Sequence, residues 1–248
     1  MTESFKNDLI ENLNIIGLSI SDIQMEQLYK FYIMLVEKNK VMNLTAITEE
    51  HDVIVKHFID SMSIYNKEVN GFQINESSMS DKSIIDVGTG AGFPGLVLKI
   101  LFPDLKVVLS DSLNKRLNFI QEVIDVLGLK DIELVHGRAE DLAHNPKYRE
   151  KFDFATSRAV ANLSTLTEYD LPFVKVGGYF MAYKSGKIEE ELANASRAIS
   201  IIGGEVRNKV NFRLSDGESE RSIVFIYKIK KTPKNYPRKA GTPSKSPL

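Results

Sequence analysis

The sequence predicts an α/β fold with a mostly parallel, twisted sheet, an antiparallel hairpin at one edge and a helical annex at the N-terminus. Three observations carry this prediction. Short β-branched runs alternate with amphipathic segments from residue 83 onward, the last two runs have no helix between them, and the first 66 residues show only helical patterns. Alternating strands and helices form right-handed crossovers in a parallel sheet, whereas a terminal hairpin adds antiparallel pairing.

The first two helices of the annex have recognisable ends. One helix should begin near Thr2 and end at Gly17. Ser21 and Gln24 form a capping-box pattern, and the apolar residues that follow recur every three or four positions, which predicts a second helix.

A third helix should begin at Thr48, whose side chain is expected to cap it. His57 and Asp60 lie three positions apart on this helix, and we interpret them as a solvated or capping pair rather than as catalytic groups. The polar, turn-rich residues 70–83 predict the end of the annex. The expected divisions are a helical annex over residues 1–75, an α/β domain over 76–231 and a basic, proline-rich arm over 232–248.

The α/β part is predicted from periodicity and from turn residues. The expected strands are 83–87, 106–110, 132–135, 152–156 and 178–183, followed by the hairpin strands 205–213 and 222–229. The expected helices are 94–102, 112–127, 162–171 and 187–202, with Gly128 ending the second of them.

Composition excludes several classes of protein. The 248 residues are 43% hydrophobic, which is enough to bury one large core. Cysteine is absent, so disulfides, thiolate metal sites, iron–sulfur clusters and a cysteine nucleophile are excluded. His51, His136 and His144 lack partners at ligand spacing, and no metal site is expected. Without a signal pattern or a long apolar run, the protein is expected to be cytoplasmic and free of the membrane.

Charge is distributed unevenly along the chain. The net charge is −1, but residues 228–248 contain seven basic residues and no acidic one, which leaves 25 basic and 33 acidic residues in the remainder. Four of the eight prolines also lie in the last 17 residues. Two roles are open for this arm: it contacts RNA phosphates, or it packs on the domain with Tyr236 as its anchor.

A glycine-rich loop carries the strongest functional signal. Gly88, Gly90 and Gly92 follow a predicted strand and precede a predicted helix, as in nucleotide-binding loops. Residues 90–95 match the dinucleotide pattern G-x-G-x-x-G, so NAD is one candidate ligand. Asp86, two residues before the first glycine, instead suits a ligand with a cationic end, such as S-adenosylmethionine.

Two further acidic positions fit a nucleoside ligand. Asp111 ends the second strand, 19 residues after Gly92, where an acid commonly bonds ribose hydroxyls. After the third strand, Glu140 and Asp141 are placed to accept from an adenine amino group. The alternative for this second pair is that both residues only favour the dipole of the next helix.

The type of acceptor atom is narrowed by what the sequence lacks. Methylation at pyrimidine C5 requires a cysteine thiolate, and the chain has none. Residues 156–162, after the fourth strand, lack the Asn/Asp-Pro-Pro-aromatic clamp of amino-directed methyltransferases. A purine N7 has its own in-plane lone pair, so it needs no general base, and no catalytic residue is assigned.

Several segments, in their order along the chain, resemble the bacterial 16S ribosomal RNA guanine-N7 methyltransferase family (RsmG, or glucose-inhibited division protein B). The segments are residues 41–48, 57–61, 86–95, 111–116, 136–140 and 157–161, together with the tail from residue 232. One departure is Gly137, where relatives often have an acidic residue.

The resemblance implies a Rossmann-like class I S-adenosylmethionine-dependent methyltransferase. It also implies transfer of a methyl group to N7 of one guanine in the decoding-region loop of 16S rRNA, with naked rRNA or a 30S assembly intermediate as substrate. The cofactor contacts that it implies are Gly88, Phe93, Ala139, Glu140 and Arg158. We expect a monomer.

Arg158 and several lysines and arginines complete the expected site. The Arg158 guanidinium should pair with Asp86 or bind the cofactor's carboxylate. Candidates for contact with rRNA phosphates are Lys115, Arg116, Arg138, Lys234, Arg238 and Lys239. For the first three, ordinary surface charge is an equal alternative. An NAD-linked oxidoreductase and a non-catalytic RNA-binding module are the alternative functions.

Overall fold

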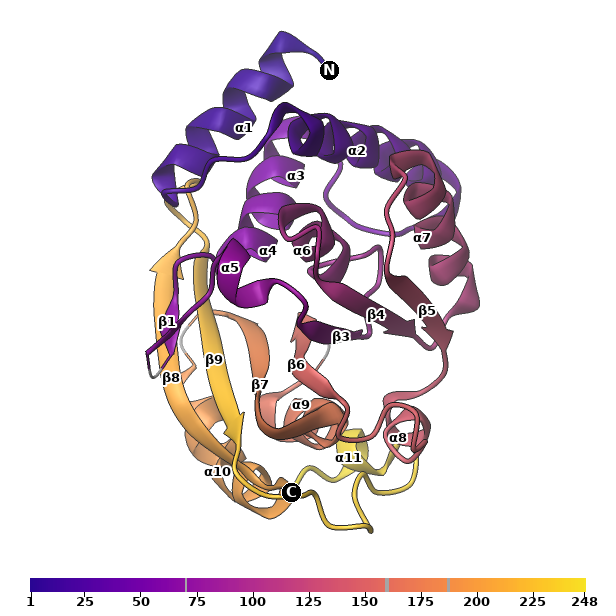
Figure 1. Ribbon diagram of the computed structural model, residues 1–248, viewed down its shortest axis with the longest axis vertical. Coiled ribbons are helices and arrows are strands. Elements are labelled where there is room, and N and C mark those ends of the chain that lie inside the picture. Colours follow the sequence, from indigo (N-terminus) through magenta and orange to yellow (C-terminus); the bar gives the residue numbers. More distant parts are fainter. Residues whose placement is uncertain (70, 159–160, 187) are drawn as a thin grey trace.

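The computed structural model describes residues 1–69, 71–158, 161–186 and 188–248. A seven-stranded sheet in the order β5-β4-β3-β6-β7-β9-β8 runs through the molecule, with helices on both faces (Figure 1). Its strands are β3 (Ser83–Val87), β4 (Lys106–Asp111), β5 (Ile132–His136), β6 (Phe152–Arg158), β7 (Val174–Ser185), β8 (Gly204–Arg213) and β9 (Glu220–Lys228).

Strand pairing confirms the predicted sheet and refines its edge. The pairs β3–β4, β4–β5, β3–β6 and β6–β7 are parallel, whereas β7–β9 and β9–β8 are antiparallel. The second hairpin strand, β9, inserts between β7 and β8, so β8 forms the edge. The chain builds outward from β3 in one direction through β4 and in the other through β6. Parallel sheets of this kind bind ligands at the carboxyl ends of the strands beside this switch point.

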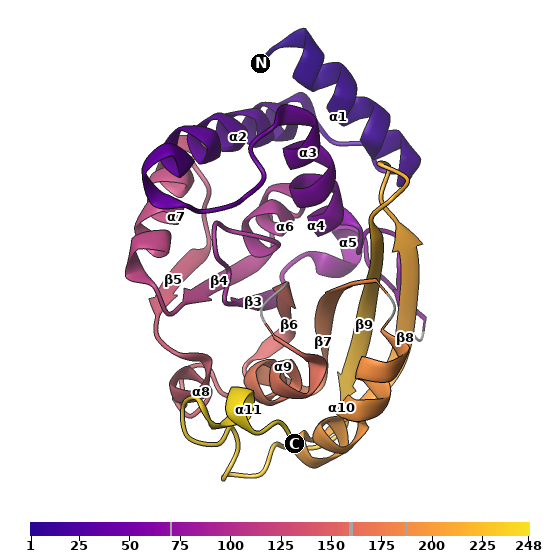
Figure 2. The same cartoon turned by 180° about the vertical axis from the view of Figure 1, so that it is seen from behind.

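The helices divide between the two faces, as the front and rear views show (Figures 1 and 2). One face carries α2 (Asp22–Met42), α6 (Gly95–Leu101) and α7 (Asn114–Leu127), and the other carries α8 (Ala139–Leu142), α9 (Leu163–Asp170) and α10 (Glu189–Ile202). A short 3₁₀ turn, η2 (Leu171–Phe173), links α9 to β7. Each face packs a separate apolar cluster against the sheet. In the ranges that the structure describes, no helix is long and apolar enough to cross a membrane.

The ends of most helices match the predicted ends. Helix α1 (Glu3–Ile15) begins after Thr2, whose hydroxyl accepts a bond from the Phe5 amide. The predicted capping box is present at α2, where Ser21 and Gln24 exchange hydrogen bonds. Gly128 ends α7 in the left-handed conformation. Lys187, the predicted first residue of α10, lies outside the described residues.

The third helical run differs from the prediction. It consists of α3 (Glu50–Val53), a π-helical turn η1 (Ile54–Ile59) and α4 (Asp60–Met62). The expected Thr48 cap is wrong, because the helix begins after Glu49 and no side chain caps it. A π turn widens the helix and often occurs at functional sites.

Residues 70–83 contain more structure than their polar composition predicts. Strands β1 (Glu68–Val69) and β2 (Phe72–Gln73) form a hairpin, and α5 (Glu76–Met79) follows it. The Phe72 ring lies 5.8 Å from the Phe154 ring of the main sheet. Tertiary packing therefore orders a segment that local composition predicts as a boundary; Asn70 lies outside the described residues.

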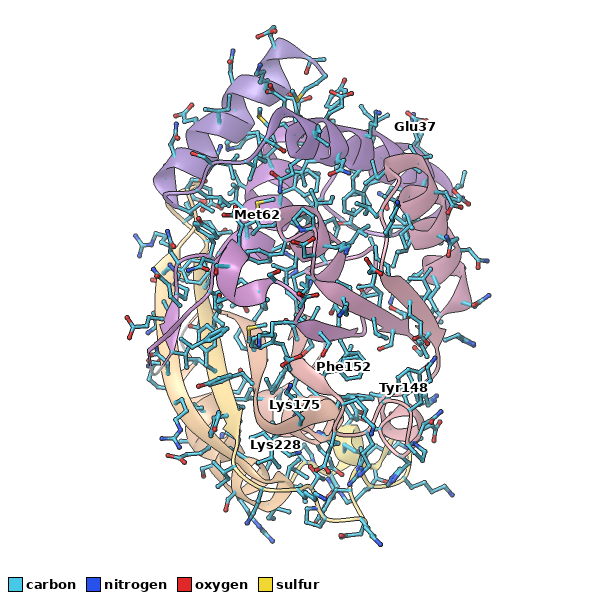
Figure 3. All side chains as sticks on the ribbon, viewed as in Figure 1. Glu37, Met62, Tyr148, Phe152, Lys175 and Lys228 are labelled. Carbon is cyan, nitrogen blue, oxygen red and sulfur yellow. The ribbon has the colours of Figure 1, made fainter. Side chains whose placement is uncertain are left out.

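The C-terminal arm packs on the domain and ends in α11 (Thr242–Lys245). Its start is tied to the buried Lys228, near the arm in Figure 3, whose ammonium donates to the Leu171 carbonyl at 2.8 Å and to the Thr232 hydroxyl. Tyr236 is partly buried against the apolar cluster of that face, as one of the two expected roles requires. A polar anchor is Arg238, which forms an ion pair with the buried Glu168 at 2.7 Å.

Candidate functional site

A cavity of about 400 Å³ lies over the glycine loop at the carboxyl ends of β3 and β4. Residues 88–91 and Phe93 of the loop form one part of its wall, and Asp111, Ser112 and Arg116 form another. The remaining lining residues are Leu44, Thr45, His57 and Arg158. Its size falls within the roughly 300–1,000 Å³ that is usual for small-molecule sites.

The glycines of the loop serve two different purposes. Gly90 has a φ of +63°, and a Cβ added there would have no described atom within 4 Å. Gly95, at the start of α6, is instead packed tightly, because an added Cβ would lie 2.4 Å from a Leu109 methyl carbon and 2.8 Å from an Asp86 carboxylate oxygen. Gly90 therefore leaves space for a ligand, whereas Gly95 permits close packing between helix and strand.

Asp86 holds the glycine loop in place through hydrogen bonds. Its side chain is fully buried, and Oδ2 accepts hydrogen bonds from the Thr89 hydroxyl at 2.7 Å and from the Gly95 amide at 2.8 Å. Burial raises the pKa of this carboxyl to about 6, against the lowering effect of the two hydrogen bonds. We expected Asp86 to contact the cationic end of a ligand directly. The structure does not place it for such a contact, because Asp86 is not among the described residues that line the cavity.

Asp111 lies in the cavity wall and ties β4 to the loop. Its Oδ2 accepts from the Gly90 amide at 3.0 Å, and its Oδ1 accepts from the Leu113 amide at 2.8 Å. The Arg116 guanidinium lies 3.3 Å from Oδ2. Oδ2 therefore already has two donors, Gly90 and Arg116, whereas Oδ1 has only one and can still accept a ligand hydroxyl.

His57, from the π turn, also lines this cavity and packs against Phe93 of the glycine loop. The two rings stack with centroids 4.4 Å apart and an interplanar angle of 13°. The Arg158 Nη2 lies 3.1 Å from the His57 Nδ1, and the Thr45 hydroxyl lies 2.8 Å from Nε2. A guanidinium only donates, so Nδ1 accepts and the ring proton is on Nε2.

Burial, reinforced by the neighbouring Arg158 charge, lowers the pKa of His57 to about 3. The imidazole is therefore neutral at physiological pH. Both of its ring nitrogens are already engaged in hydrogen bonds, which argues against a role as a proton acceptor in catalysis.

Arg158, at the end of β6, connects the sheet to the N-terminal helices. Its Nη1 donates to the Asp60 Oδ2 at 2.9 Å and to the Lys56 carbonyl at 3.1 Å. The expected pairing of Arg158 with Asp86 is therefore corrected, since the observed acid is Asp60. The interpretation of His57 and Asp60 as a solvated pair is also wrong, because they are only 8% and 4% exposed.

A second cavity, of about 240 Å³, adjoins the first, because His57 and Arg158 line both of them. Its other lining residues are Ile47, Lys56, Asp60, Tyr183, Lys184, Ser185 and Arg221. Two separate spaces thus meet at one histidine and one arginine, and this arrangement suits a pair of ligands that react with each other.

Comparison with known proteins identifies the family. A family model described as rRNA small subunit methyltransferase G matches residues 24–224. The chain belongs to the rRNA small subunit methyltransferase G family. It is 49% identical over 241 residues to the ribosomal RNA small subunit methyltransferase G of Leuconostoc mesenteroides, covering 97% of this chain and 98% of the relative. The protein of the same name from Lachnoclostridium phytofermentans is 50% identical over 239 residues, covering 96% of each chain.

Solved structures resemble this chain in part. A crystal structure of an rRNA methylase from Streptococcus thermophilus is 19% identical with a TM-score of 0.46, covering 61% of this chain and 90% of that one. Membership in the methyltransferase G family confirms the predicted resemblance. It does not favour the oxidoreductase or the non-catalytic RNA-binding module.

The predicted cofactor residues of this methyltransferase G family member fall into two groups. The cavity is lined by Gly88, Gly90, Phe93, Asp111 and Arg158. The described lining omits Gly92, whose added Cβ would meet Leu96 at 3.0 Å, and also Ala139 and Glu140. Glu140 is buried, and its Oε1 accepts from the Gly241 amide of the C-terminal arm.

The residues predicted to contact RNA also fall into two groups, exposed residues and residues paired with acidic side chains. Lys115, Arg138, Lys234 and Lys239 are exposed. Arg116 lies at the cavity beside Asp111, and Arg238 is bound to Glu168. The sequence did not indicate that Thr45 and His57 line the cavity over the glycine loop, although both belong to segments that resemble the family. The last such segment, 157–161, includes residues 159 and 160, which lie outside the described residues.

Proposed function

We propose that the protein transfers a methyl group from S-adenosylmethionine to N7 of a specific guanine in the decoding-region loop of 16S rRNA. The observation that carries the proposal is the pair of adjoining cavities that share His57 and Arg158. The cavity over the glycine loop suits the nucleoside cofactor, and the smaller one suits a single base. Curated relatives that cover nearly the whole chain are named as ribosomal RNA small subunit methyltransferases.

The residues over the glycine loop fit the cofactor. Gly90 leaves open space where a side chain would otherwise stand. Asp111 retains a free lone pair on Oδ1 for a ribose hydroxyl, and Gly88 and Phe93 line the same cavity. When bound, S-adenosylmethionine supplies an electrophilic methyl group on a sulfonium. Asp86 acts indirectly by holding the loop, and Ala139 and Glu140 follow β5, next to β4, as candidate contacts to the adenine.

The chain's own contribution to the reaction is positioning. A guanine N7 attacks with its in-plane lone pair, so no proton leaves the base before attack. The neutral His57 and its two hydrogen bonds keep the wall between the two cavities fixed. The Arg158 charge is partly balanced by the Asp60 carboxylate at 2.9 Å, which reduces its repulsion of a cationic cofactor.

The surface around the site supplies candidates for binding the rRNA backbone. Lys115 and Arg138 are exposed on the segments that follow β4 and β5, and Arg116 lies at the cavity. Lys234 and Lys239 are exposed on the arm. Phosphate contacts of this kind make binding salt-dependent. We propose that the protein acts as a monomer in the cytoplasm, on 16S rRNA or on a 30S assembly intermediate.

A labelling experiment tests this proposal. The protein is incubated with cofactor carrying a tritiated methyl group and with unmodified 16S rRNA, either naked or assembled into 30S particles. Borohydride reduction followed by aniline cleaves RNA at N7-methylguanine, so a single cleavage site in the decoding-region loop is expected. Labelled RNA that resists cleavage would contradict N7 as the acceptor, and unlabelled RNA would contradict rRNA methylation.

A parallel titration separates the alternative functions. Adenosylmethionine and adenosylhomocysteine should bind, whereas NAD should not. Selective binding of NAD would favour the oxidoreductase. If the protein binds RNA but none of these three small molecules, the result would favour the non-catalytic module.

A further inference from the structure

The second cavity contains one buried carboxylate oxygen that its surroundings leave unsatisfied. Asp60 lines this cavity and is 4% exposed. Its Oδ2 accepts from Arg158, but its Oδ1 receives no hydrogen bond from any described residue. The Arg221 Nε lies 3.3 Å from Oδ1 and is not aligned to donate to it. A buried acceptor without a donor is costly unless water or a ligand supplies one.

The rest of the cavity suits one flat, polar ring. Its volume of about 240 Å³ lies below the usual range for drug-sized ligands, which is roughly 300–1,000 Å³. Ile47 and the ring of Tyr183 supply apolar surface, while Lys56, Lys184 and Arg221 supply positive charge. The Lys56 ammonium is paired with Asp52 and the Lys184 ammonium with Glu191 and the Ala161 carbonyl, so each has only its remaining N–H groups for a ligand. The Tyr183 hydroxyl donates to the Ser61 carbonyl at 2.8 Å, so it is already occupied. A base with acceptors on one edge and donors on the other would satisfy both kinds of group.

Guanine has this pattern, and adenine does not. Guanine carries the acceptors N7 and O6 on one edge and the donors N1–H and the 2-amino group on the other. Only O6 can accept from the cationic groups of the cavity, because N7 must keep its lone pair free to attack the methyl group. A carboxylate accepts well from two adjacent N–H groups. Adenine presents an acceptor at N1 instead, which a carboxylate repels. Both purines have a nucleophilic N7, so the choice between them must be made at the opposite edge.

We propose that Asp60 is the residue that selects guanine, by accepting hydrogen bonds from N1–H and the 2-amino group of the target base in the second cavity. This inference rests on the proposed function. Asp60 Oδ2 remains bonded to Arg158, and Oδ1 is the principal acceptor for the base. The same side chain thereby orients the arginine that lines both cavities and identifies the base that enters one of them.

The experiment varies the base and the carboxylate together. A synthetic RNA fragment carrying guanine, inosine or adenine at the target position is ligated into 16S rRNA and used naked or in 30S particles. Inosine lacks only the 2-amino group, so kcat/KM of the unaltered enzyme should fall about 10–150-fold, the worth of one hydrogen bond to a charged acceptor. Adenine should react more slowly still.

The variant Asp60→Asn should remove this preference. Arg158 holds the amide oxygen at the Oδ2 position, so the amide nitrogen faces the base, where it opposes the guanine donors and suits adenine N1. Guanine should then react no more than about threefold faster than inosine, and the preference for guanine over adenine should shrink. The control Asp52→Asn removes an equal charge from the same helical run, at a residue that pairs with Lys56 and is 41% exposed. It should leave the preference unchanged.

Three outcomes are distinguishable. An unaltered enzyme that methylates guanine and inosine equally overturns the role of Asp60, whether or not the variant folds. A variant that slows guanine and inosine by the same factor shows that Asp60 only positions Arg158, and it also overturns the proposal. No transfer to the guanine-bearing RNA in either form overturns the proposed function itself. Adenosylhomocysteine affinity and the melting temperature, measured for each variant, show whether the cofactor site and the fold are intact.

Discussion

Replacing Arg238 with alanine would leave the Glu168 carboxylate buried without its main partner. Glu168 is 0% exposed, and its two oxygens accept from Nε and Nη2 of this arginine and from the Arg238 backbone amide. The substitution removes both guanidinium donors and leaves only the amide. Breaking a buried pair by removing one partner costs about 3–5 kcal/mol.

This loss should be visible in a melting experiment. For a chain of this length, each kcal/mol corresponds to a shift of about 2–4 °C, so the melting temperature should fall by about 6–20 °C. The matched control is Lys239→Ala, which removes the same charge from the next residue, whose side chain is exposed. Its effect on stability should stay within about 0.5 kcal/mol.

The same two variants test whether the arm contacts RNA. If Lys239 neutralises one phosphate, Lys239→Ala should flatten the salt dependence of rRNA binding by about 0.7–0.9 log units, which is the slope that a single neutralised phosphate contributes. Arg238→Ala should act mainly on the melting temperature and only weakly on this salt dependence. Equal melting temperatures for the two variants would refute the reasoning, because they would show that the Arg238–Glu168 pair does not anchor the arm.

Three further predictions follow from the loop and its neighbours. Gly95→Ala should destabilise the fold by about 1–3 kcal/mol through overpacking. Gly90→Asp should cost about 1 kcal/mol in urea unfolding, because its φ of +63° is left-handed, and it should abolish adenosylhomocysteine binding in a calorimetric titration. Loss of ligand binding in Gly95→Ala but not in Gly90→Asp would contradict the two assigned roles. The folded pKa of Asp86 is raised to about 6, so the folded state holds a proton that the unfolded chain loses near pH 4, and stability should fall by about 3 kcal/mol as pH rises from 4 to 6. Asp86→Asn should lose this component in urea melts, and an identical pH profile would refute it. The folded pKa of His57 is lowered to about 3, so the unfolded chain binds the proton first, and stability should fall by up to about 5 kcal/mol as pH falls from 6.5 to 3. His57→Gln should flatten that acid limb, and an unchanged limb would show that His57 is not buried as a neutral ring.

Local patterns predicted most of the sheet and its crossover helices. The strand over Ser83–Val87 was predicted with both of its ends, because a β-branched run is bounded by polar residues and by the glycine loop. The end of α7 was predicted because Gly128 adopts the left-handed conformation, which suits glycine at a helix end. These features depend on a few adjacent residues, and therefore a single sequence contains the information.

Features that depend on distant contacts were not predictable in this way. The hairpin at β1 and β2 forms in a segment whose composition indicates a boundary, and contacts with the main sheet order it. Asn208 of β8, for example, donates to the Glu68 carbonyl at 2.8 Å, across 140 positions. The arm is similar, because its basic residues suggest RNA, while Glu168, the acid that binds Arg238, lies 70 positions earlier.

The residues of the candidate site show the same difference between features set by adjacent residues and features set by distant contacts. The glycine loop and Asp111 were predicted because a contiguous motif and a strand end specify them. The wall formed by His57, Asp60 and Arg158 was not, because Asp60 and Arg158 are 98 positions apart. Moreover, two polar residues three positions apart look alike on an exposed and on a buried helix. Segments 57–61 and 157–161 both resemble the family, yet resemblance alone does not indicate that they meet. Their contact at the end of β6 brings the two separate motifs together where both cavities are lined, and it leaves one oxygen of the Asp60 carboxylate without a hydrogen bond from any described residue.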